Sequence, residues 1–404
     1  MRSGKRLRLW LIQSLYKSAN TILRAFRRML WPVSPTQAPQ RVCIYRIGNV
    51  GDMVCALPAM RAIRRAYPLA RLTLLTSPGR MNTPGAREVL EGNNWLDDLI
   101  VYHDTDIASW VGRRTLLHRL RQDHVDLWVE LPTVGASLLT LLRNMVFAKL
   151  SGAKWGSGWR ISTIHLWSQL QSDLLNFPSQ VDRLLRIVRE EGLGDEKIEY
   201  GLARNPEISN AAKETLRRAG IRNNQPFLAI APGAKRATNR WMPERWIEVG
   251  RELAGSGHRL LLLGGPSEIE VCKRIADGIG SEAVSIAGQT SLVVLPEILR
   301  RCTIVLCVDS GVQHIAGAVG SSCVSLTAAR DYQGKWHPHG VHTVIEKRVP
   351  CHTCLLEHCP NDNLCMREIT VAEVVGAAMQ LMRHSRIPLG QASRPGTSPE
   401  LHVR

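Results

Sequence analysis

From residue 41 to residue 385, short apolar segments of strand length alternate with segments that have helical composition. Repeated strand–helix units predict an α/β fold with a parallel sheet, because a helical crossover returns the chain to the same end of the sheet. Helices are expected, among others, at 53–66 and 110–122. Strands are expected at 41–46, 71–76, 99–102 and 125–131 in a first series, and at 227–231, 259–263, 283–287, 303–308, 323–326 and 342–345 in a second.

The two series indicate two domains, since a chain of 404 residues is too long for one ordinary core. We predict an N-terminal segment over 1–40, a first domain over 41–205 and a second over 206–385, with a polar helical junction at 205–226. Residues 386–404 are rich in Pro, Ser and Gly and are expected to be disordered. The expected architecture is two Rossmann-like, doubly wound domains facing a central cleft, with ligands at the carboxyl ends of the strands.

Residues 1–40 are strongly basic. They contain eight Lys and Arg and no Asp or Glu, in a chain of net charge +17. This charge favours polyanionic partners, namely anionic lipid, a phosphorylated glycolipid or nucleic acid. Over residues 7–30 the pattern predicts an amphipathic helix. Its apolar face comprises Leu11, Leu15, Ile22, Phe26 and Met29, and its polar face comprises Lys17, Asn20, Arg24 and Arg28.

An acid-free basic helix flanked by Trp10 and Trp31 suits the surface of an anionic bilayer. Two alternatives stay open at this point: a helix that packs on its own domain, or a disordered basic tail. Residues 31–39 are expected to be a linker. The chain contains no run of 18 apolar residues, and residues 1–30 do not have the pattern of a signal peptide.

The segment after the strand at 303–308 predicts an anion site. Asp309, Ser310 and Gly311 form a turn, and a small-residue helix begins near Val312. The free N–H groups and positive dipole end of a helix start bind anions, and glycine permits close approach of the backbone. His314 can reach the same place from one turn into the helix. The pattern fits a diphosphate and points towards nucleotide-activated substrates.

A second strand-to-helix turn follows the strand at 41–46. Gly48 and Gly51 permit a tight turn that places Asp52 near a helix N-terminus. A carboxylate there can take a proton from an attacking hydroxyl. The alternative is a structural helix N-cap, which is common for Asp. The turn does not match G-x-G-x-x-G, and the chain has no P-loop motif, which disfavours dinucleotide oxidoreductases and P-loop NTPases.

The second domain opens with a strand, the turn at Gly233, and a basic loop. Lys235, Arg236 and Arg240 can neutralise phosphates, and Thr238 can add a hydroxyl. The alternative is a solvated basic loop. At the end of the next strand, Glu268 follows two glycines, where it either holds a ribose hydroxyl or caps a helix.

The ten cysteines fall into two groups. Cys43, Cys55, Cys272, Cys302, Cys307 and Cys323 are scattered through apolar segments, which is typical of buried reduced thiols. The other four, in a C-x2-C-x4-C-x5-C spacing, resemble a zinc knuckle with a loose second pair. Reduced packing thiols or a labile disulfide are favoured over structural zinc. These four are Cys351, Cys354, Cys359 and Cys365.

In their combined order, these motifs resemble glycosyltransferase family 9, the bacterial lipopolysaccharide heptosyltransferases. The resemblance covers roughly residues 41–380. It rests on the Arg-Ile-Gly-Asn-Val-Gly-Asp loop with Ala-Leu-Pro-Ala (46–59), the Pro-Gly-Ala loop with Trp-x-Pro (232–243), Gly-Gly-Pro-x-Glu (264–268), Asp-Ser-Gly-x-x-His-x-Ala (309–316), a second Trp-x-Pro (336–338) and the Cys-rich segment (350–365).

The resemblance implies a GT-B fold and an inverting, metal-independent transfer without a cofactor. The donor would be a nucleotide sugar, typically ADP-heptose, and the acceptor the Kdo–lipid A inner core at the cytoplasmic face of the inner membrane. By position, Asp52 would be the general base. Ser310 and Gly311 would hold the diphosphate. Asp309 would contact sugar hydroxyls, His314 would support that pocket, and Arg240 would compensate the leaving-group charge.

Other functions stay open. A GT-B transferase could use another donor or acceptor. A non-catalytic, membrane-associated scaffold is disfavoured, since it needs neither Asp52 nor the segment with Ser310 and His314. A nucleic-acid-binding protein is not expected, because no binding motif accompanies the charge.

Overall fold

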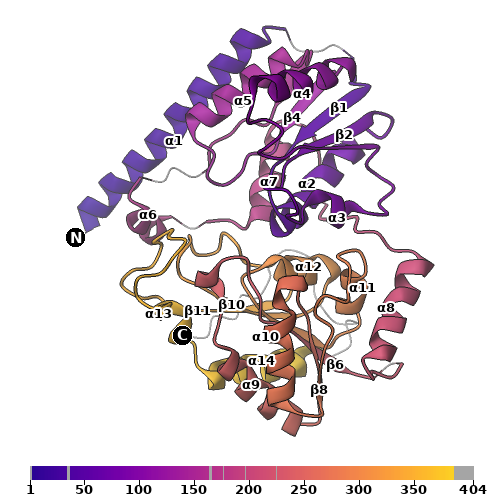
Figure 1. Cartoon of the computed structure of the whole chain (residues 1–404). Coiled ribbons are helices and arrows are strands. Elements are labelled where there is room, and N and C mark those ends of the chain that lie inside the picture. Colours follow the sequence, from indigo (N-terminus) through magenta and orange to yellow (C-terminus); the bar gives the residue numbers. More distant parts are fainter. Residues whose placement is uncertain are drawn as a thin grey trace. The chain divides into compact units, whose positions relative to one another are not determined.

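The computed structural model describes residues 2–33, 37–162, 166–175, 177–195, 197–223 and 225–385. The chain divides between Ala203 and Arg204 into two compact units, each built around its own parallel sheet (Figure 1). The predicted tail at 386–404 lies outside the described residues.

The first unit contains a five-stranded parallel sheet with the order β3-β2-β1-β4-β5. The first strand lies between the second and the fourth, as in a Rossmann fold. Val42 of β1 pairs with Leu72 of β2 on one side and with Leu127 of β4 on the other. The strands are β1 (Arg41–Tyr45), β2 (Arg71–Thr76), β3 (Asp98–Val101), β4 (Leu127–Glu130) and β5 (Trp155–Ser157).

Helices cover both faces of this sheet, with α2 and α7 on one side and α5 with α1 on the other (Figure 1). The doubly wound topology predicted from the strand–helix alternation is confirmed. The helices are α1 (Arg2–Leu30), α2 (Val50–Ala66), α3 (Ala86–Leu90), α4 (Trp110–Gln122), α5 (Leu138–Leu150), α6 (Ser168–Leu174) and α7 (Gln180–Glu190).

The N-terminal helix α1 packs on the first unit. Leu23 is buried in a core cluster with side chains of α5. Asn20, expected on the polar face, instead donates to the backbone oxygen of Ile161 and accepts from its N–H, at 2.9 and 3.0 Å. Trp31, expected in a linker, is buried and stacks on Trp159 at a ring distance of 5.5 Å. The interpretation of this segment as a disordered basic tail is therefore wrong.

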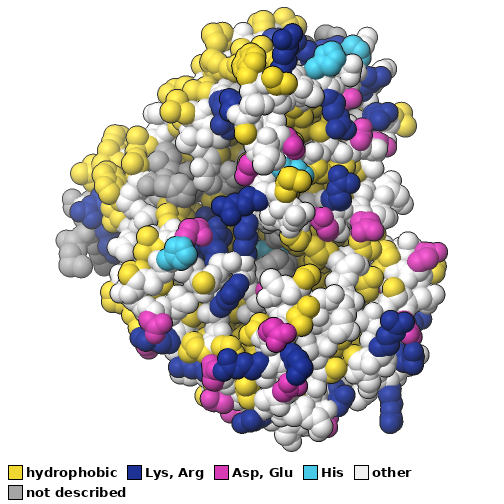
Figure 2. Space-filling model, in the orientation of Figure 1, with side chains coloured by type: hydrophobic (Ala, Val, Ile, Leu, Met, Phe, Trp, Pro, Cys, Tyr) yellow, Lys and Arg dark blue, Asp and Glu magenta, His cyan; other side chains and the backbone are white. Residues whose placement is uncertain are grey.

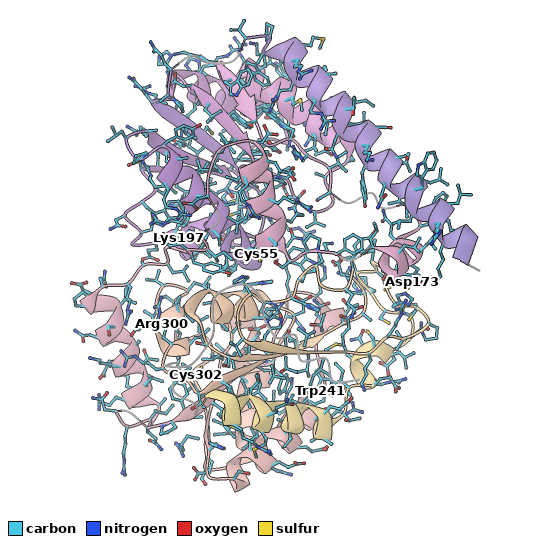
Figure 3. The ribbon with its side chains drawn as sticks, turned by 180° about the vertical axis from the view of Figure 1, so that it is seen from behind. Cys55, Asp173, Lys197, Trp241, Arg300 and Cys302 are labelled. Carbon is cyan, nitrogen blue, oxygen red and sulfur yellow. The ribbon has the colours of Figure 1, made fainter. Side chains whose placement is uncertain are left out.

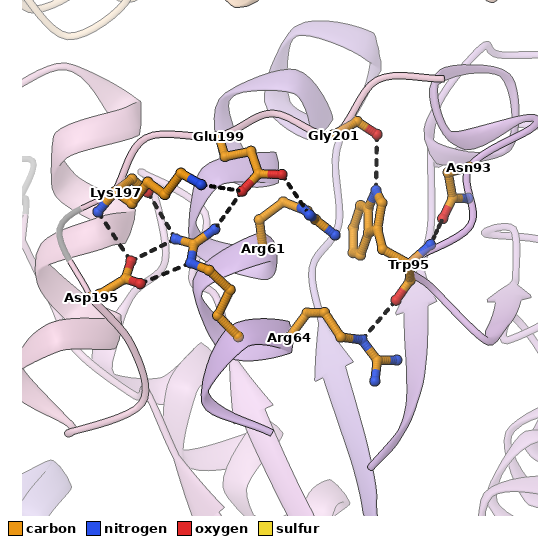
Figure 4. A network of polar contacts seen from close by, with 9 residues as sticks. Arg61, Arg64, Asn93, Trp95, Asp195, Lys197, Glu199 and Gly201 are labelled. Carbon is orange, nitrogen blue, oxygen red and sulfur yellow. Dashed lines mark hydrogen bonds and ion pairs between the residues drawn. The ribbon is translucent and has the colours of Figure 1, made fainter. Parts of the chain in front are cut away.

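A polar network fastens the end of the first unit to α2 (Figure 4). Arg65 holds Asp195 through two nitrogens, at 2.6 and 2.8 Å, and Arg61 holds Glu199 at 2.6 Å. The indole N–H of Trp95 donates to Gly201 at 2.9 Å. The segment before the division of the chain therefore belongs firmly to the first unit.

The second unit contains a six-stranded parallel sheet with the order β11-β10-β9-β6-β7-β8. Counted within the unit this order is 6-5-4-1-2-3, the complete Rossmann arrangement. The predicted and observed strands agree closely. They are β6 (Phe227–Ala231), β7 (Arg259–Leu262), β8 (Ala283–Ser285), β9 (Ile304–Val308), β10 (Cys323–Thr327) and β11 (His342–Glu346).

Helices α9 and α14 pack together beside this sheet, and α10 packs on α9. Trp241, labelled in Figure 3, lies in the core cluster of the unit. Its ring meets that of Trp246 edge-to-face at 5.1 Å. The elements are α8 (Pro206–Arg218), η1 (Ala237–Asn239), α9 (Pro243–Gly255), η2 (Pro266–Glu268), α10 (Ile269–Ile279), α11 (Leu295–Leu299), α12 (Gly311–Val319), α13 (Leu364–Arg367) and α14 (Val371–Ser385).

Among the described residues, no helix is both long and apolar enough to cross a bilayer. The six scattered cysteines are free thiols, of which Cys302 is partly exposed and the others are buried. The prediction of reduced packing thiols for this group is confirmed.

Candidate active site

In each unit, polar side chains gather where the strand order reverses. In a doubly wound sheet this switch point is the usual ligand site. In the first unit, Arg46 after β1 donates to the backbone oxygen of Pro132, beyond β4, at 2.8 Å. In the second, Asn239 beyond β6 donates to the carboxylate of Asp309, after β9, at 3.1 Å.

Asp52 is the third residue of α2, and Asn49 is the N-cap. The helix begins three residues earlier than predicted, so the interpretation of Asp52 as the N-cap is wrong. One Asp52 oxygen accepts from the Asn49 N–H at 3.2 Å, and the other accepts from Arg46 at 3.2 Å. The side chain keeps 26% of its surface exposed. Each carboxylate oxygen has a second lone pair, so Asp52 can still accept a proton from a bound hydroxyl.

Gly48 is required for this geometry. Its φ is +152°, and a Cβ added there would lie 2.3 Å from the Cβ of Asp52. The glycine therefore lets the Asp52 side chain fold back against the turn. Gly51, the other predicted turn glycine, is the second residue of α2 itself.

Two buried arginines meet beside Asp52, and Arg46 is the one that bonds to it. Arg46 has no exposed surface, and Arg183 of α7 is 3% exposed. Both donate to the backbone oxygen of Pro132, at 2.8 and 2.6 Å. Burial lowers the pKa of Arg46, and burial together with the nearby Arg46 charge lowers the pKa of Arg183 to about 9. No role for either residue was predicted from the sequence.

Glu130, the last residue of β4, is buried beside this subsite. Asn144 of α5 donates to it at 2.8 Å and the Trp128 indole at 3.4 Å. Burial raises the pKa of Glu130 to about 7, although these two bonds and the charge of Arg46 oppose the rise. The carboxyl therefore changes charge near neutral pH, and no sequence signal marked it.

In the second unit, Ser310 is the N-cap of α12, which begins at Gly311 as the motif predicted within one residue. Among the described residues, the buried hydroxyl of Ser310 has no hydrogen-bond partner, and neither do the Thr238 hydroxyl or the Asn239 side-chain oxygen. Buried polar atoms without partners are costly, so a polar ligand or a water molecule is expected to bond to them. All three belong to loops that follow β6 and β9.

Asp309 is held between two amides. Asn239 donates to one oxygen at 3.1 Å, and Gln313 of α12 donates to the other at 2.6 Å. Gln313 also donates to the backbone oxygen of Trp336 at 3.0 Å, which ties the helix start to the loop after β10. Burial and the nearby Asp331 charge raise the pKa of Asp309 to about 7. Gln313 was not predicted, because its only signal in the sequence is its place four residues after Asp309.

His314 is buried, and its ring lies 6.1 Å from that of Trp336. Burial lowers its pKa to about 4, so the imidazole is neutral near pH 7 and acts as a hydrogen-bond donor or acceptor. In the same loop, Asp331 accepts from Lys335 at 2.7 Å and from the Trp336 indole at 2.9 Å. These bonds fix the loop that lies against Gln313.

The basic loop after β6 does not present a uniform row of cations. Lys235 is exposed, whereas Arg240 turns back and donates to the backbone oxygen of Ala234 at 2.9 Å. Arg236 pairs with Glu357 at 3.0 Å. Thr238 is buried in η1, next to Asn239. The structure thus places Asn239, and not the predicted Thr238, against Asp309 after β9, and it leaves Lys235 on the surface.

Glu268 accepts from the Gly265 N–H at 2.8 Å, which is a capping interaction for the helical segment that follows. It also lies against Gly233, because a Cβ added to Gly233 would be 1.7 Å from a carboxylate oxygen of Glu268. The ends of β6 and β7 are therefore in contact through these two residues, and the capping role does not exclude a role in ligand binding.

The four C-terminal cysteines line one small cavity of about 20 Å³, together with Thr238 and Arg330. All four are free thiols with partial exposure. No group of three or more His, Cys, Asp or Glu among the residues described here could hold a metal ion. At these four cysteines the structure contains neither a disulfide nor a zinc-binding arrangement. Of the alternatives given above, reduced thiols are the one that agrees with the structure.

Two Rossmann-like units, each with a glycine turn and a polar cluster at its switch point, define a GT-B protein, an architecture of nucleotide-sugar transferases. The sequence model of glycosyltransferase family 9 (heptosyltransferase) matches residues 113–364. The chain belongs to this family and is a glycosyltransferase.

Several relatives are heptosyltransferases. The chain is 24% identical to the lipopolysaccharide core heptosyltransferase OpsX of Haemophilus influenzae, over 72% of this chain and 80% of that one. It is 22% identical to lipopolysaccharide heptosyltransferase 2 of Escherichia coli, over 69% and 79%.

Solved structures share the fold. A family 9 glycosyltransferase from Veillonella parvula gives a TM-score of 0.70 at 17% identity, with 87% of this chain and 100% of that chain covered. The Escherichia coli ADP-heptose LPS heptosyltransferase II gives a TM-score of 0.61 at 19% identity, with 85% and 99% covered.

Proposed function

We propose that the protein transfers a heptose from ADP-heptose to the inner core of lipopolysaccharide, with inversion at the anomeric carbon. The names of the relatives support the sugar and the acceptor. The observation that carries the proposal is the start of α12, where the buried side-chain oxygens of Ser310 and of the neighbouring Asn239 have no hydrogen-bond partner among the described residues. This is the chemistry that binds a diphosphate through hydrogen bonds.

On the donor side, Ser310, Gly311 and the first N–H groups of α12 would hold the diphosphate. Asp309, fixed by Asn239 and Gln313, would accept hydrogen bonds from sugar hydroxyls. Neutral His314 would support the same pocket. Glu268 would accept from the ribose, since its carboxylate lies at the Gly233 turn.

On the acceptor side, Asp52 would remove the proton of the attacking hydroxyl. The hydroxyl oxygen bonds to the anomeric carbon from the face opposite the diphosphate, whose bond to that carbon breaks, so the configuration inverts. Arg46 and the Asn49 N–H hold the two Asp52 oxygens in fixed directions, which is the positioning that a general base requires.

The leaving nucleoside diphosphate gains negative charge as the bond breaks. Helix-start N–H groups stabilise that charge more in the transition state than in the ground state. Lys235 and Arg240 would add positive charge, the latter after leaving its contact with Ala234. The reaction requires that the base and the donor reach the same anomeric carbon in the reacting complex.

The proposed place of action is the cytoplasmic face of the inner membrane, where such an acceptor is anchored. The basic composition of the chain suits an acceptor that carries phosphates and carboxylates. An anionic membrane surface is accordingly the second proposed partner.

A donor screen tests this function. ADP-heptose is compared with UDP- and GDP-sugars, on deep-rough lipopolysaccharide, for the wild type and for the near-isosteric Asp52→Asn. We expect transfer from ADP-heptose only, loss of transfer in Asp52→Asn with donor binding retained, and an inverted product by NMR.

Transfer only from another donor would still support a glycosyltransferase, but one that moves a different sugar. Full activity of Asp52→Asn would show that Asp52 is not the general base. If the folded protein neither transfers a sugar nor binds a nucleotide sugar, the alternative of a non-catalytic, membrane-associated scaffold would be favoured.

A further inference from the structure

We propose that the outward face of α1 is a docking surface for an anionic phospholipid bilayer, on which the helix lies flat. This inference builds on the proposed function, whose acceptor is membrane-anchored, and it identifies the surface that makes the contact. It rests on the division of α1 into two apolar stripes, only one of which the protein itself covers.

The inner stripe packs on the first unit. It comprises Ile12 and Leu23, which are buried, and partly buried neighbours at helical spacing, namely Tyr16, Ala19, Phe26 and Leu30. Three polar or aromatic attachments hold this side. Asn20 bonds twice to Ile161, Arg27 pairs with Glu191 at 2.5 Å, and the Trp31 indole donates to Ala153 at 2.9 Å. The helix therefore has a fixed rotation on the unit, and its other face is fixed outward.

The outer stripe is apolar but uncovered. Leu7, Leu11, Leu15, Ile22 and Met29 follow each other at spacings of four and seven, which aligns them along one side of a helix. Their exposed fractions run from 39% for Leu11 to 66% for Met29. Four of the five residues predicted as the apolar face belong to this exposed stripe, and Phe26 alone turns inward.

Exposed hydrophobic side chains are concentrated in this region. The 29 residues of α1 contribute six of the twenty exposed large hydrophobic side chains among the described residues, the five above and Trp10. Leu166 and Trp167, 45% and 62% exposed, precede α6, which contacts α1 through the bond from Gln171 to the Tyr16 hydroxyl at 2.9 Å. Figure 2 shows hydrophobic side chains gathered along the part of the molecule where α1 runs in Figure 1.

The positive charge beside the outer stripe indicates which partner binds there. Arg6, Lys17, Arg24 and Arg28 are exposed on α1, and no Asp or Glu occurs before residue 41. A second copy of the chain docked on this face would bring two basic helices together. Anionic headgroups instead neutralise the cations while the apolar stripe enters the acyl boundary. The helix is not apolar enough to span, which agrees with a position in the plane of the interface.

Vesicle sedimentation tests the surface. Full-length protein is mixed with vesicles of phosphatidylcholine alone or with a third of phosphatidylglycerol. We expect binding to the anionic vesicles that weakens at high salt, and a loss of at least about tenfold in the double variant Leu11→Glu/Leu15→Glu. Neutralising Lys17, Arg24 and Arg28 to Gln should weaken binding by roughly fivefold per charge.

Leu69→Glu is the matched control, because Leu69 is 98% exposed on a loop of the same unit. It makes the same chemical change away from α1 and should leave vesicle binding unchanged. Circular dichroism checks that every variant is folded. Equal vesicle binding by Leu11→Glu/Leu15→Glu and the wild type would overturn the proposal.

Two further readouts separate this proposal from its rivals. A dimer in solution that Leu11→Glu/Leu15→Glu dissociates, without vesicle binding by the wild type, would assign the face to a second copy and overturn membrane docking. Transfer to detergent-dispersed acceptor reports the proposed function by itself. We expect Leu11→Glu/Leu15→Glu to keep that activity and to lose activity only on acceptor embedded in vesicles.

Discussion

The guanidinium of Arg46, which has no exposed surface, lies 3.2 Å from a carboxylate oxygen of Asp52, whose side chain is one quarter exposed. The arginine is held in turn by the backbone oxygens of Leu131 and Pro132, at 3.3 and 2.8 Å. The direction of the proposed base is thus set by the end of β4, a strand distant in sequence.

Arg46→Lys keeps the charge but cannot bond to β4 and to Asp52 at once, because an ammonium lacks the guanidinium fork. We expect kcat to fall by about 10- to 100-fold through misplacement of Asp52, with the donor KM unchanged. Steady-state kinetics on protein shown to be folded measures the effect. Arg64→Lys, at an arginine within α2, should leave kcat near the wild-type value. An unchanged kcat in Arg46→Lys would mean that Asp52 does not depend on Arg46.

Gly233→Ala separates the two roles of Glu268. The added methyl would lie 1.7 Å from a Glu268 oxygen, so the flexible carboxylate must move. If Glu268 binds the ribose, the donor KM should rise about tenfold with little change in kcat. The thermal midpoint should fall by a few degrees whether or not Glu268 binds the ribose, because the displaced carboxylate loses its capping bond to the Gly265 N–H. Gly255→Ala, where no atom lies within 4 Å of the new methyl, is the control. An unchanged donor KM in Gly233→Ala would leave Glu268 as a helix cap alone.

The pH dependence of kcat/KM for the donor should follow the protonation of the Asp309 carboxyl. Its pKa is raised to about 7, so below pH 7 the carboxyl is neutral and loses acceptor capacity for sugar hydroxyls. We expect kcat/KM for the donor to fall about tenfold per pH unit below this value. Asp309→Asn should have a low, flat profile over the same range. An acid limb that persists in Asp309→Asn would assign the titration to another group.

Glu130 should make the first unit less stable as pH rises. Its pKa in the fold, about 7, lies above the ordinary value of 4.5, so the neutral form is favoured by folding and stability declines between pH 4.5 and pH 7. The loss is of the order of 3 kcal/mol. Glu130→Gln keeps an uncharged side chain and should gain stability relative to wild type by about that amount between pH 5 and pH 8. Urea unfolding at both pH values measures this, with exposed Glu91→Gln as the control.

The sequence was a good guide to the strands, because a buried parallel strand is a short continuous apolar run. The run at 227–231 predicted β6 with its observed bounds. The helix start at Ser310 followed from the same reasoning, since an apolar strand, a turn with glycine and small residues define it locally.

Partners brought together by the fold could not be predicted in this way. Asn239 and Gln313 hold Asp309, and Arg183 shares Pro132 with Arg46, yet each looks like an ordinary polar residue in sequence. Their hydrogen-bond partners lie 4 to 86 residues away in the chain, and for Asn20 and Ile161 the separation is 141 residues. Periodicity likewise found one apolar stripe on α1 but could not tell which stripe the first unit covers.

The attachments of α1 by Asn20, Arg27 and Trp31 have a consequence for how the enzyme would meet its acceptor. A helix of 29 residues is a rod about 44 Å long. Such a rod, held flat with its outer stripe in the interface, can turn about the membrane normal, but it can neither tilt its ends apart in depth nor roll freely about its own axis. Because the rod is fastened to the first unit, that unit inherits the same restriction. Its search for a lipid-anchored acceptor then becomes two-dimensional, with Asp52 kept within a narrow range of heights above the headgroups.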